Sequence, residues 1–230
     1  MKKTLLFLSL FTIQLFAQQK LSFEFDYAKF NYDSTSTYLE VYYSLSQKSL
    51  TLFSEDSKSF VGAYLSVLIS DTASKEILLD RTYQSKTQIN ASDESYKSQN
   101  LLGNFGFILK QGTYSFQITG TDIADSNKYL TYNEVITIKD YPADIFSISD
   151  IQLASRIVTD SKNTKSIFYK NTMEVFPNPH NIYSEQMPVL FFYSELYNLN
   201  LPKYSEKNLL LVQQLNDSYG NLLDIKRKSI

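Results

Sequence analysis

The chain has 230 residues, no cysteine and no tryptophan, and its 22 basic and 24 acidic residues nearly balance. This balance argues against a nucleic-acid partner, which would require a clustered basic surface. Without cysteine the chain has neither disulfides nor a lipid-modified N-terminal cysteine, so hydrophobic packing must hold it together. The 18 Tyr and 16 Phe supply ample aromatic area for such a core.

The N-terminus has the three zones of a secretory signal peptide. Lys2 and Lys3 are positively charged, an apolar run follows over residues 5–15, and the small residue Ala17 precedes a polar one. The run is well short of the roughly 20 apolar residues that span a bilayer. We therefore expect residues 1–17 to be removed by cleavage after Ala17. The mature chain is expected to be periplasmic or extracellular, with no integral membrane segment.

Residues 18–140 are expected to form a first β-sandwich domain, because apolar and polar residues alternate there. Over 38–45, for example, the alternation places Glu40 and Ser44 on the face opposite the apolar one. Two strand pairs are expected to be joined by short turns, one at 71–74 and the other at 110–112, and 84–100 is expected to be a loop or irregular edge. About seven strands are typical of an Ig-like or fibronectin III-like antiparallel sandwich. They are expected at 21–30, 38–45, 60–70, 76–83, 103–109, 114–119 and 129–139.

A second domain is expected over 147–230, after a linker at 141–146. All five prolines lie from Pro142 onward, and Pro142 itself cannot donate a sheet hydrogen bond. Five further strands are predicted, with a turn at 216–220 before the last. This is fewer than a sandwich requires, so we expect the second domain to be incomplete. The strands are expected at 148–158, 173–176, 189–197, 209–215 and 222–226.

Gly112-Thr113-Tyr114 opens a late strand of the first domain. This pattern is typical of the tyrosine corner of Ig-like sandwiches, in which the tyrosine hydroxyl bonds to backbone a few residues upstream. The alternative is an ordinary hairpin glycine followed by a core tyrosine. Either reading makes Tyr114 a structural residue.

Two groups of polar residues are candidates for binding or catalytic sites. His180 is the only histidine, so a His-based triad or multi-His metal site is excluded, and we expect His180 to be solvated on a rigid turn between prolines. Asp122, Asp125 and Asn127 could together hold calcium in a loop. The same residue types are also those that plain turns prefer, and we favour the turn.

Tyr38 and Tyr42 could stack on sugar rings if they are exposed, although cross-strand packing is the alternative role for such residues. The sequence has no Gly-x-Ser-x-Gly motif and no glycine loop that could cradle a phosphate. We therefore expect no enzyme activity and no cofactor, and we assign no residue a catalytic, cofactor-binding or metal-binding role.

Several blocks of this sequence resemble the N-terminal β-sandwich region of GWxTD domain-containing proteins. They are Phe25-Asp26-Tyr27-Ala28-Lys29-Phe30, the stretch 38–44, Ile148-Ser149-Asp150-Ile151-Gln152, Val175-Phe176-Pro177-Asn178-Pro179 and the stretch 190–199. The Gly-Trp-x-Thr-Asp motif that names the family is absent; in the family it lies C-terminal to the β modules, which agrees with the expectation that the second domain is incomplete. The resemblance implies an exported multidomain bacterial protein and carries no functional residue with it.

The sequence thus predicts an exported bacterial envelope protein whose β-sandwich modules form a non-catalytic binding or spacer region. Its partner would be a protein or a glycan. One alternative is a carbohydrate-binding module. The other is an accessory region of an enzyme whose catalytic part lies C-terminal to this chain.

Overall fold

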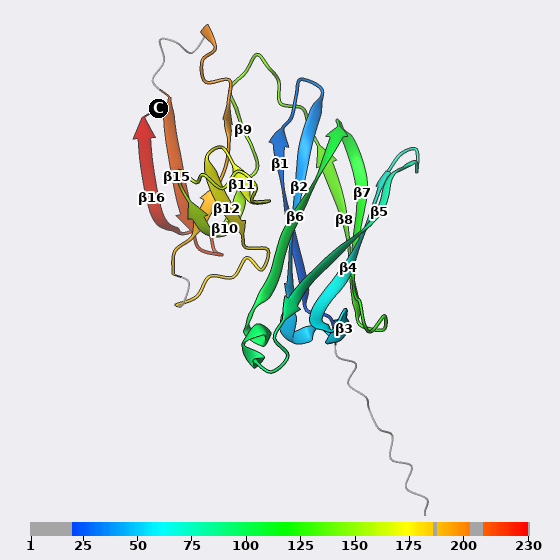
Figure 1. Ribbon diagram of the computed structural model, residues 1–230. Helices are drawn as coiled ribbons and strands as arrows, with labels where there is room; N and C mark the ends of the chain where they lie inside the picture. The colour runs from blue at the N-terminus through cyan, green and yellow to red at the C-terminus, as the bar shows by residue number, and fades with distance from the viewer. Residues whose placement is uncertain (1–19, 186–187, 203–208, 230) are drawn as a thin grey trace, which may run out of the picture.

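The computed structural model describes residues 20–185, 188–202 and 209–229 (Figure 1). In these ranges the chain forms antiparallel strands and two short 3-10 helices, η1 (Gln47–Ser49) and η2 (Glu94–Ser98), and no α-helix. The expected all-β fold is therefore confirmed. None of the described segments is a helix long and apolar enough to cross a membrane. The predicted signal peptide, 1–17, lies outside the described residues.

The first module is a sandwich of two antiparallel sheets (Figure 1). The three-stranded sheet has the order β1-β2-β6. The five-stranded sheet has the order β3-β4-β7-β8, with β5 paired to the other side of β4. The strands are β1 (Phe23–Asn31), β2 (Ser36–Ser46), β3 (Phe53–Glu55), β4 (Lys58–Asp71), β5 (Ile77–Ile89), β6 (Asn100–Lys110), β7 (Gly112–Asp122) and β8 (Tyr129–Ile138).

The core of the first module lies between these sheets. Because side chains alternate across a strand, every second residue of β2, β4 and β7 points inward. Burial of this apolar area is the main stabilising term for a module without disulfides. The largest side chains that are almost fully buried there are Leu21, Phe23, Leu39, Leu45, Leu65, Ile69, Phe116, Ile118, Ile136 and Ile138.

Of the two expected strand pairs, the first is confirmed and the second is wrong. β4 and β5 pair across the turn at Asp71, whose Oδ1 accepts the backbone N–H groups of Ala73 and Ser74 at 2.8 and 2.7 Å. β6 instead pairs with β2, and β7 pairs with β4 and β8, so Gln111 carries the chain from one sheet to the other. Alternation marks both strands as half-buried and contains no information on which sheet each one joins.

The stretch 84–100 is also more regular than expected. β5 continues through Ile89, paired with β4 along its length, and the remainder contains η2, whose N-cap Asp93 accepts the N–H of Ser95 at 2.9 Å. The expected loop is therefore confined to the few residues around η2. The short strand β3, which the sequence pattern did not predict, pairs with β4 through a turn in which Asp56 and Ser57 have positive φ.

Tyr114 stands where the chain crosses between the sheets. Its hydroxyl donates a hydrogen bond to the carbonyl of Lys110 at 2.9 Å, which confirms the tyrosine corner. A Cβ at Gly112 would lie 3.0 Å from that hydroxyl, so the glycine leaves room for the close approach. The corner fixes the geometry of a connection that has one residue outside the two strands.

The second module contains a four-stranded antiparallel sheet in the order β11-β12-β10-β13. The expected strand 148–158 is split into β9 and β10, and the expected strand 189–197 into β13 and β14. The predicted turn 216–220 joins β15 to β16, with Gly220 at a φ of 85°. The strands are β9 (Ser147–Ile148), β10 (Gln152–Val158), β11 (Tyr169–Lys170), β12 (Met173–Pro177), β13 (Phe191–Tyr193), β14 (Leu196–Tyr197), β15 (Leu210–Asn216) and β16 (Leu222–Ser229).

We predict that Tyr114→Phe lowers the free energy of unfolding by about 1 kcal/mol, the usual net value of one intramolecular hydrogen bond. The ring and its packing remain, so the loss reports the corner bond. Urea unfolding measures the change, with Tyr129→Phe, at an exposed site, as the matched control. Equal stability of the two variants would show that the corner bond contributes nothing.

Candidate functional site

The most elaborate cluster of side chains lies where the second module packs on the first. It covers the outward face of the three-stranded sheet, the face that alternation alone would leave in water. The buried apolar residues there are Ala28, Phe30 and Tyr42 from the first module and Ala154, Val175 and Tyr193 from the second. Together with Glu40 and Lys170 we call these residues the intermodule interface. In Figure 1 the second module lies on the side of the first that carries β1 and β2.

Glu40 is a buried carboxylate at the centre of the interface, with 5% of its surface exposed. Its Oε2 accepts a hydrogen bond from the Tyr42 hydroxyl at 2.7 Å and an ion-paired hydrogen bond from Lys170 Nζ. Its Oε1 accepts a hydrogen bond from Asn104 Nδ2 at 2.8 Å. A buried charge is tolerated when it is paired and fully hydrogen-bonded, and these three donors satisfy both oxygens.

Lys170 supplies the opposite charge from the second module. Its Nζ lies 4.8, 5.6 and 5.2 Å from the ring centroids of Phe30, Tyr42 and Tyr193, distances typical of cation–π contacts. It also donates to Gln152 Oε1 at 2.8 Å. Burial lowers the pKa of Lys170, and the neighbouring Glu40 carboxylate opposes that shift. The ammonium is thus held among three rings and two oxygen acceptors.

A tight turn presents Lys170 to this pocket. Lys170 ends β11, and Asn171 and Thr172 link it to β12 with φ values of 46° and 64°. Two consecutive positive-φ residues are the signature of the turn that best joins two antiparallel strands. A threonine in that conformation is unusual, because its branched Cβ crowds the backbone. A strained residue, Thr172, therefore lies two positions after the lysine that pairs with Glu40.

A second carboxylate, Glu195, ties more of the second module to β1. It accepts hydrogen bonds from the hydroxyls of Tyr193 and Tyr197 at 2.6 and 2.7 Å. The Tyr197 hydroxyl in turn accepts the backbone N–H of Asn31 at 3.0 Å. Burial, followed by the Glu195 contact, raises the pKa of both tyrosines. The network therefore runs from one module to the other through polar groups as well as apolar ones.

The segment 141–146, expected to be a linker, runs between β8 and β9 and is fastened at several points. The Tyr141 hydroxyl donates to the Lys29 carbonyl at 2.8 Å. Asn198 Nδ2 donates to the carbonyls of Pro142 and Ile145, at 2.9 Å each. The connection is thus hydrogen-bonded to β1 on one side and to the second module on the other.

A cleft of about 580 Å³ opens beside the Glu40–Lys170 pair. Aromatic side chains contribute much of its wall, among them Tyr32, Tyr38 and Tyr169. Asn31 contributes a side-chain oxygen that is buried and has no hydrogen-bond partner among the described residues. The carboxylates in its wall, Glu40 and Glu195, accept the hydrogen bonds described above.

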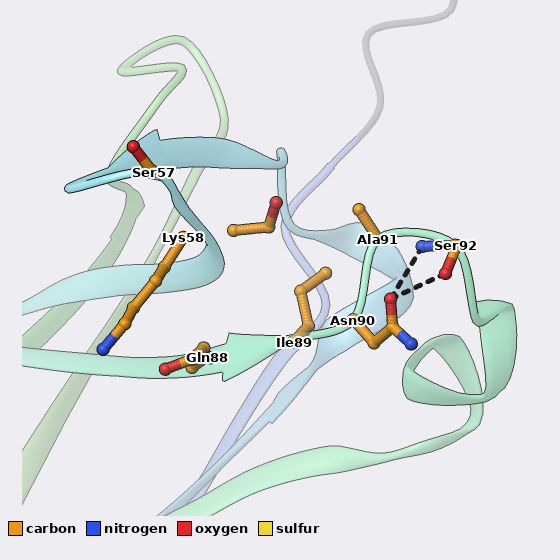
Figure 2. Close-up of a pocket in the computed structure, with 8 residues that line it drawn as sticks. Ser57, Lys58, Gln88, Ile89, Asn90, Ala91 and Ser92 are labelled. Atoms are coloured by element: carbon orange, nitrogen blue, oxygen red, sulfur yellow. Dashed lines mark hydrogen bonds between the residues drawn. The ribbon is translucent and has the colours of Figure 1, made fainter.

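A second hollow, of about 500 Å³, lies at one end of the five-stranded sheet between the β3–β4 turn and the end of β5 (Figure 2). Lys58 is the single ionisable side chain in its lining, which is otherwise Ser, Asn, Gln and small apolar residues. Asn90 Oδ1 is engaged by the N–H and hydroxyl of Ser92 at 3.2 and 2.7 Å. This hollow is a loop junction without paired reactive groups.

His180 was predicted to be solvated, but it is half-buried and held by two contacts to the first module. Its Nε2 lies 3.0 Å from Ser44 Oγ on β2 and 3.3 Å from Asn100 Nδ2 on β6. The expected turn is present, closed by the Asn181 N–H bonding to the Asn178 carbonyl at 3.0 Å. The expectation failed because the turn docks on the first module, a contact between residues 136 positions apart in sequence. His180 is therefore part of the packing between the modules.

The turn interpretation of Asp122, Asp125 and Asn127 is confirmed. Asp122 is 1% exposed, and its Oδ1 accepts the N–H groups of Ala124 and Asp125 at 2.8 and 3.0 Å. Its Oδ2 accepts the N–H of Thr51 at 2.6 Å, which fastens a distant loop. In the part of the chain that the structure describes, no three His, Cys, Asp or Glu side chains gather as they would to hold a metal ion.

The two tyrosines suggested as sugar-stacking residues differ in exposure. Tyr42 is 1% exposed and lies inside the intermodule interface, so the idea that it stacks on a sugar is wrong. Tyr38 is half-buried and lies against β6 at Gly106, where any Cβ would overlap its ring. The Glu40–Lys170 pair was not predicted from the sequence. A usable signal was present, because Tyr38 and Tyr42 lie on the same strand face as Glu40.

No protein-family model matches this chain, and a search of curated proteins finds no significant match.

We predict that Lys170→Met lowers the free energy of unfolding by about 3 kcal/mol, because it leaves the Glu40 carboxylate buried without its counter-charge. The double variant Glu40→Gln/Lys170→Met should recover much of that loss, since no unpaired charge remains. Lys97→Met is the matched control, because Lys97 forms an exposed ion pair with Glu94. If urea unfolding shows the same loss of unfolding free energy for Lys170→Met as for the control, the pair does not have the central role predicted here.

We further predict that stability falls as the pH rises through the tyrosine range. Burial raises the pKa of Tyr141 from 10.0 to about 12, and those of Tyr42, Tyr193 and Tyr197 still higher. Above about pH 10 the unfolded chain loses these protons while the folded chain keeps them, so the free energy of unfolding decreases. The lowered pKa of Lys170 acts in the opposite direction below its usual 10.5, but it is one group against four.

The check is the slope of unfolding free energy against pH between about pH 9 and pH 11. Tyr197→Phe should make the slope less steep, because one proton fewer is released on unfolding. Tyr219→Phe, at a site that is 89% exposed, is the control and should leave the slope as in the wild type. A slope that is the same in all three proteins would contradict the prediction.

Proposed function

We propose that this chain is an exported bacterial envelope protein whose β-sandwich modules act as a non-catalytic binding or spacer region. Its export would follow from residues 1–17 acting as a signal peptide cleaved after Ala17, and would place the mature chain in the periplasm or outside the cell. The observation that carries the spacer role is the intermodule interface. A spacer must hold what it presents at a fixed distance, and a flexible joint would not do so.

The composition of the interface supports a fixed arrangement. Interfaces between domains of one chain are usually polar enough to permit relative motion. Here the polar groups are internal, because Glu40 and Lys170 form a buried pair covered by Phe30, Tyr42 and Tyr193. Separating the modules would expose these rings to water and break the Glu40–Lys170 ion pair. The carboxylates of the interface serve this packing, which accords with a non-catalytic role.

The proposal predicts that the mature protein melts in one calorimetric transition and that both modules tumble with one rotational correlation time. Glu40→Lys should break this coupling, because it sets two like charges against each other in a buried site. Two transitions and two correlation times are then expected. Glu76→Lys, on an exposed turn, makes the same charge change as a control and should leave a single transition.

Two observations would overturn the proposal. Independent melting of the modules in the wild-type protein would remove the spacer role. Recovery of the secreted chain with Met1 still present, instead of an N-terminus at Gln18, would remove the signal-peptide assignment, and intact-mass spectrometry distinguishes the two.

A further inference from the structure

The outward face of the five-stranded sheet has an unusual composition. Residues 64–70 of β4, together with β7 and the edge strand β8, present a continuous surface of residues that point away from the core and carry no charge. Charged residues make up 20% of the whole chain, and protein surfaces are where they normally gather. We call this surface the uncharged face. It consists of Tyr64, Ser66, Leu68, Ser70, Thr113, Ser115, Gln117, Thr119, Thr121, Tyr129, Thr131, Asn133, Val135 and Thr137.

The strand register arranges these residues in rows across the sheet. One row is Tyr129, Thr121 and Tyr64, and the next is Thr131, Thr119 and Ser66. Within the rows polar side chains bond to one another, as Thr119 does with Thr131 at 2.9 Å and Gln117 with Asn133 at 2.7 Å. These bonds fix the side chains in place before any partner arrives, which reduces the entropy lost on binding.

Two exposed tyrosines stand in the same row. Tyr64 is 40% and Tyr129 is 58% exposed, and Thr121 on β7 lies between them. Two strand spacings separate them, which places their Cα atoms roughly 9.5 Å apart. Two aromatic side chains at that separation on a flat surface can each contact a separate sugar ring of one extended chain. The tyrosines that the sequence suggested for this role, Tyr38 and Tyr42, are at the opposite sheet.

The uncharged face is also accessible. The second module packs on the three-stranded sheet, so the five-stranded sheet faces away from it (Figure 1). Charges lie at its margin: β5 places Asp80 beside Leu68 and Lys86 beside Gly62, and Lys58 lies at the start of β4. The face is therefore bordered by charge and free of it in the middle.

We propose that the uncharged face binds a neutral, extended polysaccharide that runs across the strands along the Tyr129–Thr121–Tyr64 row. Hydroxyl and amide side chains both donate and accept hydrogen bonds, as sugar hydroxyls require. The absence of Lys and Arg leaves an anionic polymer without a counter-charge. Leu68 and Val135 alone are aliphatic, too few for the apolar inner face on which a second copy would pack sheet against sheet.

This inference deepens the proposed binding role and rests on it. The test is co-sedimentation of the mature protein with microcrystalline cellulose and with chitin, and gel retardation in a soluble neutral β-glucan, with alginate as the anionic polysaccharide. The wild-type protein is expected to bind at least one neutral polymer, to ignore alginate, and to keep its affinity when salt is added, because no ion pairs are involved.

Tyr64→Ala/Tyr129→Ala is expected to weaken binding about tenfold, since two aromatic contacts are lost. Tyr32→Ala/Tyr219→Ala removes two other exposed tyrosines and should leave the affinity unchanged. Because all four side chains are exposed, both variants should melt as the wild type does, which excludes misfolding. Thr119→Lys adds a charge in the middle of the face and should weaken binding.

Absence of binding to every neutral polymer would overturn the inference, as would salt-sensitive binding to alginate or dimerisation that the Thr119→Lys variant abolishes. These results are separable from failure of the spacer proposal. If the polymers are not bound while the protein still melts in one transition, this inference fails and the rigid arrangement stands. If cellulose or chitin is bound while the modules melt independently, the spacer proposal fails and this inference stands.

Discussion

The charge on Glu40 is the constraint around which the two modules are arranged. A carboxylate on the outward face of a sheet would ordinarily be hydrated, yet the second module removes it from water. Three donors from three separate strands replace that water, and Lys170 is the one that supplies an opposite charge. Loss of any element that positions Lys170, including the strained turn after it, would leave a buried charge unpaired. This pair joins β11 to the three-stranded sheet beside the apolar contacts of the interface.

This arrangement gives the two faces of the first module different roles. The outward face of the three-stranded sheet carries Ala28, Phe30 and Tyr42 and is covered. The outward face of the five-stranded sheet carries hydroxyl and amide side chains with Tyr64 and Tyr129 and remains in water. Residues on both outward faces alternate along their strands with inward-pointing residues, and the inward-pointing residues of the two sheets together form one core. Which face is buried a second time follows from composition, because aromatic and small residues pack and a hydroxyl-rich surface does not.

Long-range contacts explain each residue for which the local interpretation failed. His180, judged from its neighbouring prolines, reads as a solvated turn residue, but Ser44 and Asn100 reach it from the other module. The strand pattern predicts that Tyr42 is exposed, but the second module covers it. The turn of Asp122 and the corner of Tyr114 were predicted correctly because the partners that define them, the N–H groups of Ala124 and Asp125 and the carbonyl of Lys110, lie within four residues.

Alternation of apolar and polar residues by itself determined that this protein is built of strands and which stretches of the chain most of them occupy. It did so because the period of a strand is a local property of the chain. The tertiary structure decided that β6 and β7 join different sheets, that Glu40 is buried and finds Lys170, and that Tyr64 and Tyr129 stand in one exposed row. Those outcomes depend on which strands become neighbours, and that choice is made by packing between residues far apart in the sequence.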